Sequence, residues 1–565
     1  MSNLKIGLLL EPKNVDFYTY KLTKEILVNG HTPIILHGYE ESKHTNSPFF
    51  QRLINLFRKK GLKGVFHISK LGLNIFLYKI ILSLELRIVK KEFPNYNQAF
   101  SIEKLHLREI KINGIWSKNG TSFLLDKKSI SIVKSEKFDI LIRLGSGIIK
   151  GELLDASRHG VLSFHHGDNR FFRGSLAGFW EVLANHPSVG FIIQRLSQDL
   201  DGGDVLYRHS LMTRELWHLN CALLQEKSIH FMINLIIYLD KTGELPSPQE
   251  VSFCNSSPKK IIGRVSPYLN YIIKIYFPLF IKKIKRIFFG DSITRWGIKF
   301  IYDQSLNFDI SKSIEIKNLP NRFFADPFVI KHKNRNICFV EDYFIKQKKG
   351  KISAIELFQD GYKFLGNVLD EEFHLSYPYV FEHKKDIFMI PESSQNNDIR
   401  LYKAVDFPLK WKLDTVLMND ISAADISVFN KDGIWFMFLN VCSSGIGEHN
   451  SELHIFTSEK LRSSKWTPIS EPWPVISDAQ KSRNGGMFEF QNKLYRISQK
   501  HTKNHYGNGF CFNEVKELEM NNYVEKSLYC VEPNLQKNEI SCHHFHRNED
   551  FCVTDFAKRQ SLRRV

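Results

Sequence analysis

The sequence has few cysteines, and no two of them are closely spaced. Its eight cysteines are scattered over 565 residues, and no Cys-x-x-Cys motif occurs. Zinc knuckles and disulfide-rich small domains both depend on such closely spaced cysteines. We therefore expect no zinc knuckle, no disulfide framework and a reducing, cytoplasmic location.

Long apolar runs are also missing. No stretch reaches the roughly 18 uncharged apolar residues that a membrane-spanning helix needs. The apolar run at residues 6–10 is too short for a secretory signal and is typical of a first strand. A chain of this length exceeds one hydrophobic core and predicts two to four folding units.

The chain is strongly basic, with a formal net charge of +18. Most of the excess is lysine spread along the chain, so we expect no nucleic-acid partner. Segments 52–91 and 259–299 concentrate basic residues among Leu, Ile and Phe. Two interpretations stay open: helices packed on a sheet with solvated lysines, which we favour, or peripheral contact with the inner face of an anionic membrane.

Residues 1–245 alternate strand-like and helix-like segments, which predicts a Rossmann-like α/β domain with a mostly parallel sheet. Expected helices are 15–29, 151–159 and 176–184. Ligands of such sheets lie at the carboxyl ends of the strands. One such end carries Leu144, Gly145, Ser146 and Gly147, but the dinucleotide fingerprint with its acidic partner is absent. We assign these four residues to backbone contact with a cofactor.

Residues 306–565 follow a connector at 246–305 and carry a weak repeat of about 50 residues, which is typical of a β-propeller. Five units predict five blades. One register contains Asp326, Tyr377, Asp425, Asn484 and Cys542. A second register, fifteen residues after the first four of these, contains Glu341, Glu392, Asn440 and Gln499.

The propeller register gathers carboxylates at one mouth of the predicted channel. Asp326, Glu341, Glu392 and Asp425, together with Asn484, are our candidates for binding a glycan. Sugar hydroxyls need such acceptors, and sugar C–H faces stack on rings, for which we select Tyr377, Trp435 and Trp473. The alternative is that these acids cap turns at the starts of the blades.

Residues 162–174, LSFHHGDNRFFRG, hold two histidines after an apolar run. His165 and His166 are adjacent and would point to opposite faces of a strand, so they do not suit one metal ion, and we expect no metal. His166 and Asp168 either read the acceptor, supply a second acid/base, or cap the loop.

Three ordered motifs at matched spacing then point to one family. They are Ser163-Phe164-His165, Arg173-Gly174 and the segment 200–204, which reads LDGGD. With these motifs, residues 1 to about 215 resemble the catalytic domain of methionyl-tRNA formyltransferase and the sugar N-formyltransferases. The resemblance implies 10-formyltetrahydrofolate as co-substrate, with Arg173 and Gly174 closing on it.

The resemblance also implies catalytic roles for three residues. His165 would donate to the oxyanion formed when an amine attacks the formyl carbon, and Asp201 would orient His165 and receive the amine proton. Ser163 stands where the family has Asn, and a hydroxyl is a shorter, freer donor than a carboxamide. The sequence leaves open whether this site is active.

The second half resembles, more loosely, the five-bladed glycosidase propellers and the propeller-like N-terminal domain of glucosamine inositolphosphorylceramide transferase. Asp326 and Asp425 match the base and modulator of the glycosidases, but Asn484 stands where an acid is expected, so glycan binding is favoured over cleavage. The main expectation is a formyltransferase that modifies an amino sugar of a nucleotide- or lipid-linked glycan in surface-polysaccharide synthesis. The alternative is a carbohydrate-active propeller, glycosidase or glycosyltransferase, beside an inactive formyltransferase-like domain. The sequence does not set the oligomeric state.

Overall fold

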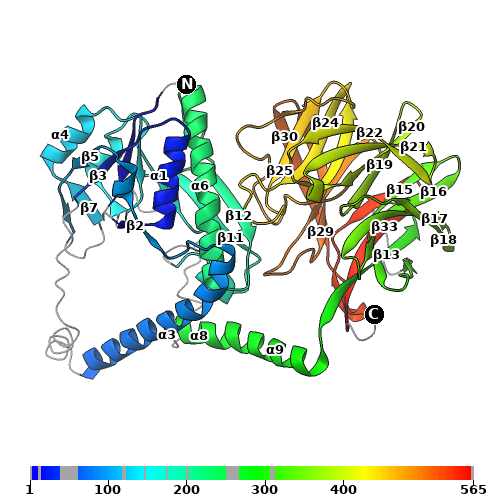
Figure 1. The fold of residues 1–565 in the computed structure, drawn as a ribbon, viewed down its shortest axis with the longest axis horizontal. Helices are drawn as coiled ribbons and strands as arrows, with labels where there is room; N and C mark the ends of the chain where they lie inside the picture. The colour runs from blue at the N-terminus through cyan, green and yellow to red at the C-terminus, as the bar shows by residue number, and fades with distance from the viewer. Residues whose placement is uncertain are drawn as a thin grey trace. The chain divides into compact units, whose positions relative to one another are not determined.

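The structure is a computed structural model. It describes residues 3–10, 14–38, 62–117, 122–145, 148–172, 176–198, 203–249, 266–305 and 312–561. The chain divides into two compact units, Met1–Leu279 and Phe280–Val565 (Figure 1). The predicted α/β domain followed by an all-β five-bladed propeller is confirmed.

The first unit is built on a seven-stranded sheet of order β12-β11-β10-β8-β1-β3-β5. Its strands are β1 (Ile6–Leu9), β3 (Ile34–His37), β5 (Glu109–Lys111), β8 (Ile140–Arg143), β10 (Val161–His165), β11 (Ser188–Arg195) and β12 (Asp204–Met212). The five strands from β10 to β5 are parallel, whereas β11 and β12 are antiparallel additions at one edge. The central strand β1 is wholly buried, because helices cover both faces of such a sheet.

Helices pack on this sheet and position its carboxyl edge. They are α1 (Phe17–Val28), α3 (Leu62–Glu92), α4 (Lys127–Ser135), α5 (Phe179–Leu183) and α6 (Trp217–Thr242), with 3-10 turns η1 (Ile102–Leu105) and η2 (Gly151–Asp155). Short strands β2 (Asn14–Asp16), β4 (Ala99–Ser101), β6 (Gly114–Trp116), β7 (Ser122–Leu125) and β9 (Ile148–Ile149) flank it. The Asp16 carboxylate caps α1 by accepting the Thr19 N–H. The helix expected at 151–159 is only the turn η2, and the one expected at 176–184 is the shorter α5.

A continuous helical stretch follows, composed of α8 (Pro267–Tyr271), a π-helical turn (Ile272–Tyr276) and α9 (Phe277–Phe289) (Figure 1). Its first part is tied to α3, because the hydroxyls of Tyr271 and Tyr276 donate to Glu85 at 2.8 and 3.0 Å. Burial raises the pKa of this Glu85 carboxyl. Among the described residues, no helix has the length and apolar character needed to cross a membrane.

The second unit contains four four-stranded antiparallel sheets that follow one another along the chain. Their strands are β15 (Arg322–His332), β16 (Arg335–Phe344), β17 (Lys349–Phe358) and β18 (Gly361–Leu369); β19 (Ser376–His383), β20 (Asp386–Glu392), β21 (Asp398–Asp406) and β22 (Lys410–Asn419); β23 (Ala423–Lys431), β24 (Ile434–Val441), β25 (Leu453–Ser458) and β26 (Thr467–Pro468); and β27 (Asn484–Phe490), β28 (Lys493–Gln499), β29 (Phe510–Glu519) and β30 (Asn522–Val531). The 3-10 turns η5 (Ser394–Asn396) and η6 (Leu535–Lys537) lie in the connections after β20 and β30.

A fifth sheet joins the two ends of the propeller. It contains β13 (Ser292–Tyr302), β14 (Ile314–Ile316), β31 (Glu539–Ser541), β32 (Phe545–Arg547) and β33 (Phe551–Ser561). β13 and β33 are paired along their whole length, from Ser292 opposite Ser561 to Tyr302 opposite Phe551 (Figure 1). The segment 246–305, expected to be a connector, therefore supplies a strand of this blade.

The repeat seen in the sequence corresponds to a bulge at one position of each inner strand. The bulges follow Ala325, Ser376, Ala424 and Asn484. At the first three bulges the next residue, Asp326, Tyr377 or Asp425, has a positive φ. In the fourth blade the positive φ is found at Gly486, but Asn484 keeps the predicted register, because its N–H donates to Asn440 as the Asp425 N–H donates to Glu392. The inner strand of that blade is one residue shorter between its bulge and its hairpin turn.

A disulfide joins Cys511 on β29 to Cys530 on β30. The two residues are directly opposite each other in the antiparallel register. The expectation that no cysteines pair is therefore wrong at this position. Spacing along the chain gave no signal, because the pairing depends on the hairpin that places two distant residues side by side.

Candidate functional site at the propeller mouth

A cavity of about 290 Å³ opens where the inner strands of the propeller begin. It is lined by Trp296, Phe323, Ala325, Asp326, Glu341, Tyr343, His374, Ser376, Glu392, Asp425, Arg483, Tyr506 and His543. All four carboxylates expected at the mouth are therefore brought together. Asn484 is not among the lining residues; it is buried, and its amide donates to the Asp425 carbonyl at 2.9 Å.

The bulges explain why two of the acids face this cavity. Asp326 and Asp425 occupy the left-handed region, with φ of 49° and 52°. A bulge changes the direction of the side chain relative to the regular strand. Backbone strain of this kind persists where the surrounding structure fixes it, and it is frequent at functional sites.

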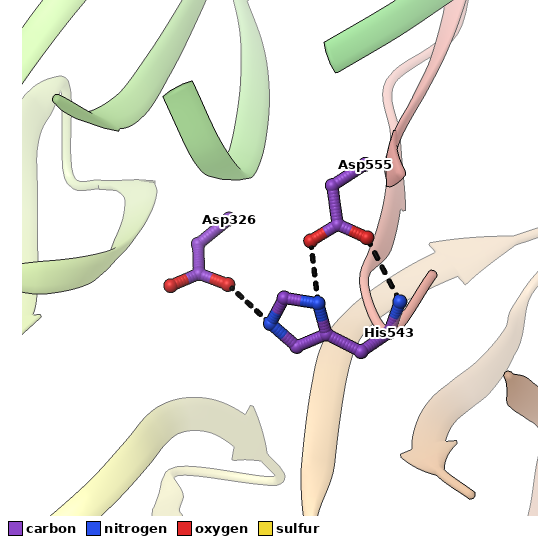
Figure 2. Close-up of side chains that lie close together, drawn as sticks. All are labelled: Asp326, His543 and Asp555. Atoms are coloured by element: carbon purple, nitrogen blue, oxygen red, sulfur yellow. Dashed lines mark hydrogen bonds and ion pairs between the residues drawn. The ribbon is translucent and has the colours of Figure 1, made fainter. Parts of the chain in front are cut away.

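Asp326 forms one end of a buried chain of charges (Figure 2). Its Oδ1 lies 3.1 Å from His543 Nε2, and His543 Nδ1 lies 2.8 Å from Asp555 Oδ2. Burial would lower the pKa of His543, but Asp555 and Asp326 outweigh it and raise the pKa to about 10. Burial would raise the pKa of Asp326, but the hydrogen bond and charge of His543 hold it below the ordinary value. Asp326 is thus a carboxylate at neutral pH.

The pKa of Glu341 is shifted in the opposite direction. Burial, followed by the nearby charges of Asp326 and Glu392, raises its pKa well above the ordinary value. His374 Nε2 lies 3.5 Å from Glu341 Oε1, while His374 Nδ1 accepts the Gly350 N–H at 2.8 Å. One cavity thus contains two carboxyl groups whose pKa values are shifted apart, one down and one up, which is the arrangement that general acid–base catalysis uses.

Asp425 is paired with the one arginine of the cavity lining. Arg483 Nε donates to Asp425 Oδ2 at 2.5 Å, and Arg483 Nη2 lies 4.0 Å from Glu392. Burial nevertheless raises the pKa of Asp425 to about 7. The charge of Arg483 lowers this pKa only in part, and the charges of Glu392 and Asp326 raise it further. The Asp425 N–H also donates to Glu392 Oε2 at 3.2 Å.

The pKa of Asp425 predicts a pH dependence of stability. The folded protein keeps a proton between about pH 4 and 7 that the unfolded chain has released, so the free energy of unfolding falls as the pH rises through this window. The slope for one proton is about 1.4 kcal/mol per pH unit. Denaturant titrations across this pH range should show that the free energy of unfolding falls less steeply with pH in Asp425→Asn than in the wild type. The exposed Asp420→Asn should retain the wild-type slope, and an unchanged slope in Asp425→Asn would contradict this assignment.

The rings at the mouth are not those chosen from the sequence. Tyr377 is fully buried, with its hydroxyl 3.2 Å from Ser427 Oγ, and Trp435 belongs to the core beside the hairpin turn at the far end of its blade. Neither lines the cavity. Trp296, Phe323, Tyr343 and Tyr506 line it instead, and the Trp296 ring contacts the His543 ring at a tilt of 59°, with the ring centroids 4.2 Å apart.

Asp326, His543 and Asp555 also have the spacing of a metal site, with one ligand atom from each within 4.8 Å of the others. The ion pairs account for this cluster without a metal. Both ring nitrogens of His543 face carboxylates and act as donors, so neither offers the lone pair that a metal ligand needs.

A second pocket, of about 230 Å³, lies at the carboxyl ends of β8 and β10 in the first unit. It is lined by Asp16, Tyr18, Thr19, Leu22, Arg143, Leu144, Gly145, Ser163, Phe164, His166, Gln225, Ser228 and Ile229. Arg143 donates to Ser163 Oγ at 3.3 Å, and Ser163 in turn donates to the Phe164 carbonyl at 3.2 Å.

The two histidines of the motif differ in this pocket. His166 is a lining residue, with Nε2 2.9 Å from Ser228 Oγ, and burial lowers its pKa to about 4, so its ring is neutral. His165 is not among the lining residues. The predicted site residues Ser146, Gly147, Arg173, Gly174 and Asp201 lie outside the described residues.

Asp168 is held in place by arginines. Burial would raise its pKa, but Arg170 and Arg208 outweigh burial and lower it. Arg208 Nη1 donates to Asp168 at 2.5 Å and also to Asn169 Oδ1 at 2.8 Å. Asp168 thus fixes the loop, as the capping alternative proposed.

Residues 310–555 match the family model described as glucosamine inositolphosphorylceramide transferase 1, N-terminal. The transferase of that name from Oryza sativa subsp. japonica is 33% identical over 217 residues, which are 36% of this chain and 28% of the relative. The Arabidopsis thaliana transferase is 30% identical over 238 residues, which are 40% of this chain and 30% of the relative. The propeller is thus similar in sequence to one part of these proteins, and the chain spans less than a third of their length.

Solved structures give weaker similarities. A putative glycoside hydrolase from Bacteroides ovatus aligns with 46% of this chain and 96% of its own, at 12% identity and a TM-score of 0.32. A sugar N-formyltransferase from Shewanella aligns with 46% of this chain and 78% of its own, at 11% identity and a TM-score of 0.27. At these scores neither carries an argument about activity.

Proposed function

We propose that the protein is a carbohydrate-active enzyme that binds a sugar at the propeller mouth and acts on its glycosidic bond. The observation that carries this proposal is that Asp326 and Glu341 line one ring-lined cavity, with the pKa of the first lowered and that of the second raised. The sequence similarity supports a sugar carried on a lipid, since the relatives are named for glucosamine and inositolphosphorylceramide.

The residues have distinct roles in this proposal. The Glu341 carboxyl donates its proton to the oxygen that leaves the anomeric carbon, and Asp326 accepts a proton from the incoming hydroxyl, water or alcohol. Arg483 and Asp425 bind sugar hydroxyls, and Trp296 stacks on the sugar ring. His543 is a positioning residue that keeps Asp326 ionised.

A direct test incubates the purified protein with glycolipids and oligosaccharides that contain amino sugars, and follows sugar release or transfer by mass spectrometry. Turnover that is lost in Glu341→Gln supports the proposal. If no sugar is bound, released or transferred across such a panel, the proposal fails.

Formyl transfer is the second candidate, and the pocket that contains Ser163 and Arg143 at the carboxyl strand ends favours it. If it operates, the protein consumes 10-formyltetrahydrofolate when an amino sugar is present. His165→Ala and Asp201→Asn should then reduce this consumption at least about a hundredfold, through loss of acid–base and oxyanion contributions. The exposed Asp155→Asn is the control. Equal rates in His165→Ala and wild type would exclude this candidate.

A further inference from the structure

Helix α9 has no buried side chain. Phe277, Phe280, Ile287 and Phe288 are 61%, 60%, 70% and 71% exposed. An apolar surface of this size on one short helix is unusual for a face that remains in water. We therefore expect another molecule to cover the apolar side chains of α9.

The residues of α9 separate by chemistry around the helix axis. At 100° per residue, Phe277, Phe280, Ile281, Ile284, Ile287 and Phe288 share one face. Lys282 and Arg286 lie opposite, Lys283 and Lys285 lie at the two borders, and Leu279 and Phe289 are apolar residues on the basic side. This is the pattern of a helix that lies in a membrane interface with its apolar face inward.

The charge around this face has one sign. Residues 268–290 contain five basic residues and no acidic one. Arg286 is paired with Asp291. Lys282, Lys283 and Lys285 have no carboxylate partner within the described part of the chain. They are therefore available to anionic headgroups.

We propose that α9 is a peripheral membrane anchor that lies flat on a bilayer rich in anionic lipids. The proposal does not depend on the function of the propeller cavity. A thirteen-residue helix face is small against the roughly 800 Å² per partner of a stable protein interface. The size of the face and its uniform charge thus favour lipid over a second copy of the chain.

Helix α3 also exposes both apolar and basic side chains. Leu73, Phe76, Leu84 and Ile88 are 47%, 60%, 50% and 48% exposed at helical spacing. The exposed basic residues of α3 include Lys79, Arg87, Lys90 and Lys91. The two acids of α3 are engaged elsewhere, since Glu85 accepts from Tyr271 and Tyr276 and Glu92 pairs with Arg214.

The test measures cosedimentation of the full chain with vesicles of phosphatidylcholine alone, or of phosphatidylcholine with roughly one third phosphatidylserine. The wild type should bind the anionic vesicles and be released by salt. Lys282→Glu, Lys283→Glu and Lys285→Glu combined should weaken this binding at least about a hundredfold. The same change at Lys346, Lys384 and Lys385, exposed in propeller turns, is the matched control and should bind as wild type.

A second variant separates insertion from charge. Phe280→Gln with Phe288→Gln should weaken binding about tenfold or more while preserving the preference for anionic vesicles. Folding is preserved because neither side chain is buried. Equal binding to both vesicle types overturns the proposal. A wild-type dimer in solution that this variant splits into monomers also overturns it, since α9 then covers a second copy.

Discussion

Asp326→Asn is expected to lose sugar turnover by at least about a hundredfold, with the fold intact. Asparagine keeps the size of the side chain and tolerates the left-handed conformation found at this position, φ 49°. It cannot accept a proton from an attacking hydroxyl. It also leaves His543 with a single carboxylate partner, Asp555.

The measurement is kcat and KM on the sugar found in the panel. Binding should persist, because Arg483, Asp425 and the rings are unchanged, so the loss should be in kcat. Asp386→Asn is the control, since Asp386 is partly exposed and pairs with Lys403 outside the cavity. A variant Asp326→Asn as active as wild type would remove Asp326 from the chemistry and leave the cavity with a binding role.

Arg496→Met should lower the free energy of unfolding by about 3–5 kcal/mol, because it leaves the Glu525 carboxylate, whose side chain is only 11% exposed, with the Tyr523 hydroxyl but no cationic partner. Arg496 is 0% exposed and donates to both oxygens of Glu525, each at 2.7 Å. It also donates to the Lys481 and Ser482 carbonyls, so it holds the turn that carries Arg483. The same substitution should therefore weaken sugar binding as well.

Arg335→Met provides a matched comparison by chemical denaturation. Arg335 makes the same two-pronged pair with Glu356, at 2.7 and 3.0 Å, but its side chain is 43% exposed. A pair in water contributes at most about 1 kcal/mol. Similar losses in the two variants would mean that burial does not set the cost of breaking these pairs.

The parts of the fold that follow from short-range patterns could be predicted. Strand–helix alternation indicated the parallel sheet, and a repeat near 50 residues indicated the blades. The same repeat brought Asp326, Glu341, Glu392 and Asp425 to one mouth, because equivalent positions of equivalent blades share one end.

The contacts that cross the repeat could not be predicted. His543 lies between β31 and β32, and only closure of the ring brings it to Asp326, 217 residues away. Arg483 lies one residue before the aligned position of its blade, which the repeat does not mark, so its pairing with Asp425 of another blade was not predicted. The choice of Tyr377 and Trp435 as sugar-stacking rings was wrong for a related reason. The sequence shows that these residues are aromatic but does not show which end of a strand faces solvent.

The pairing of β13 with β33 also imposes an order on how the protein is made. A ribosome releases β13 some 250 residues before its partner, as counted from Ser292 to Phe551. Trp296 comes with the early strand, and His543 and Asp555 come with the late segment. Four blades can form during synthesis, but the cavity is complete only once the last strand has emerged. An unfinished chain therefore carries no working site.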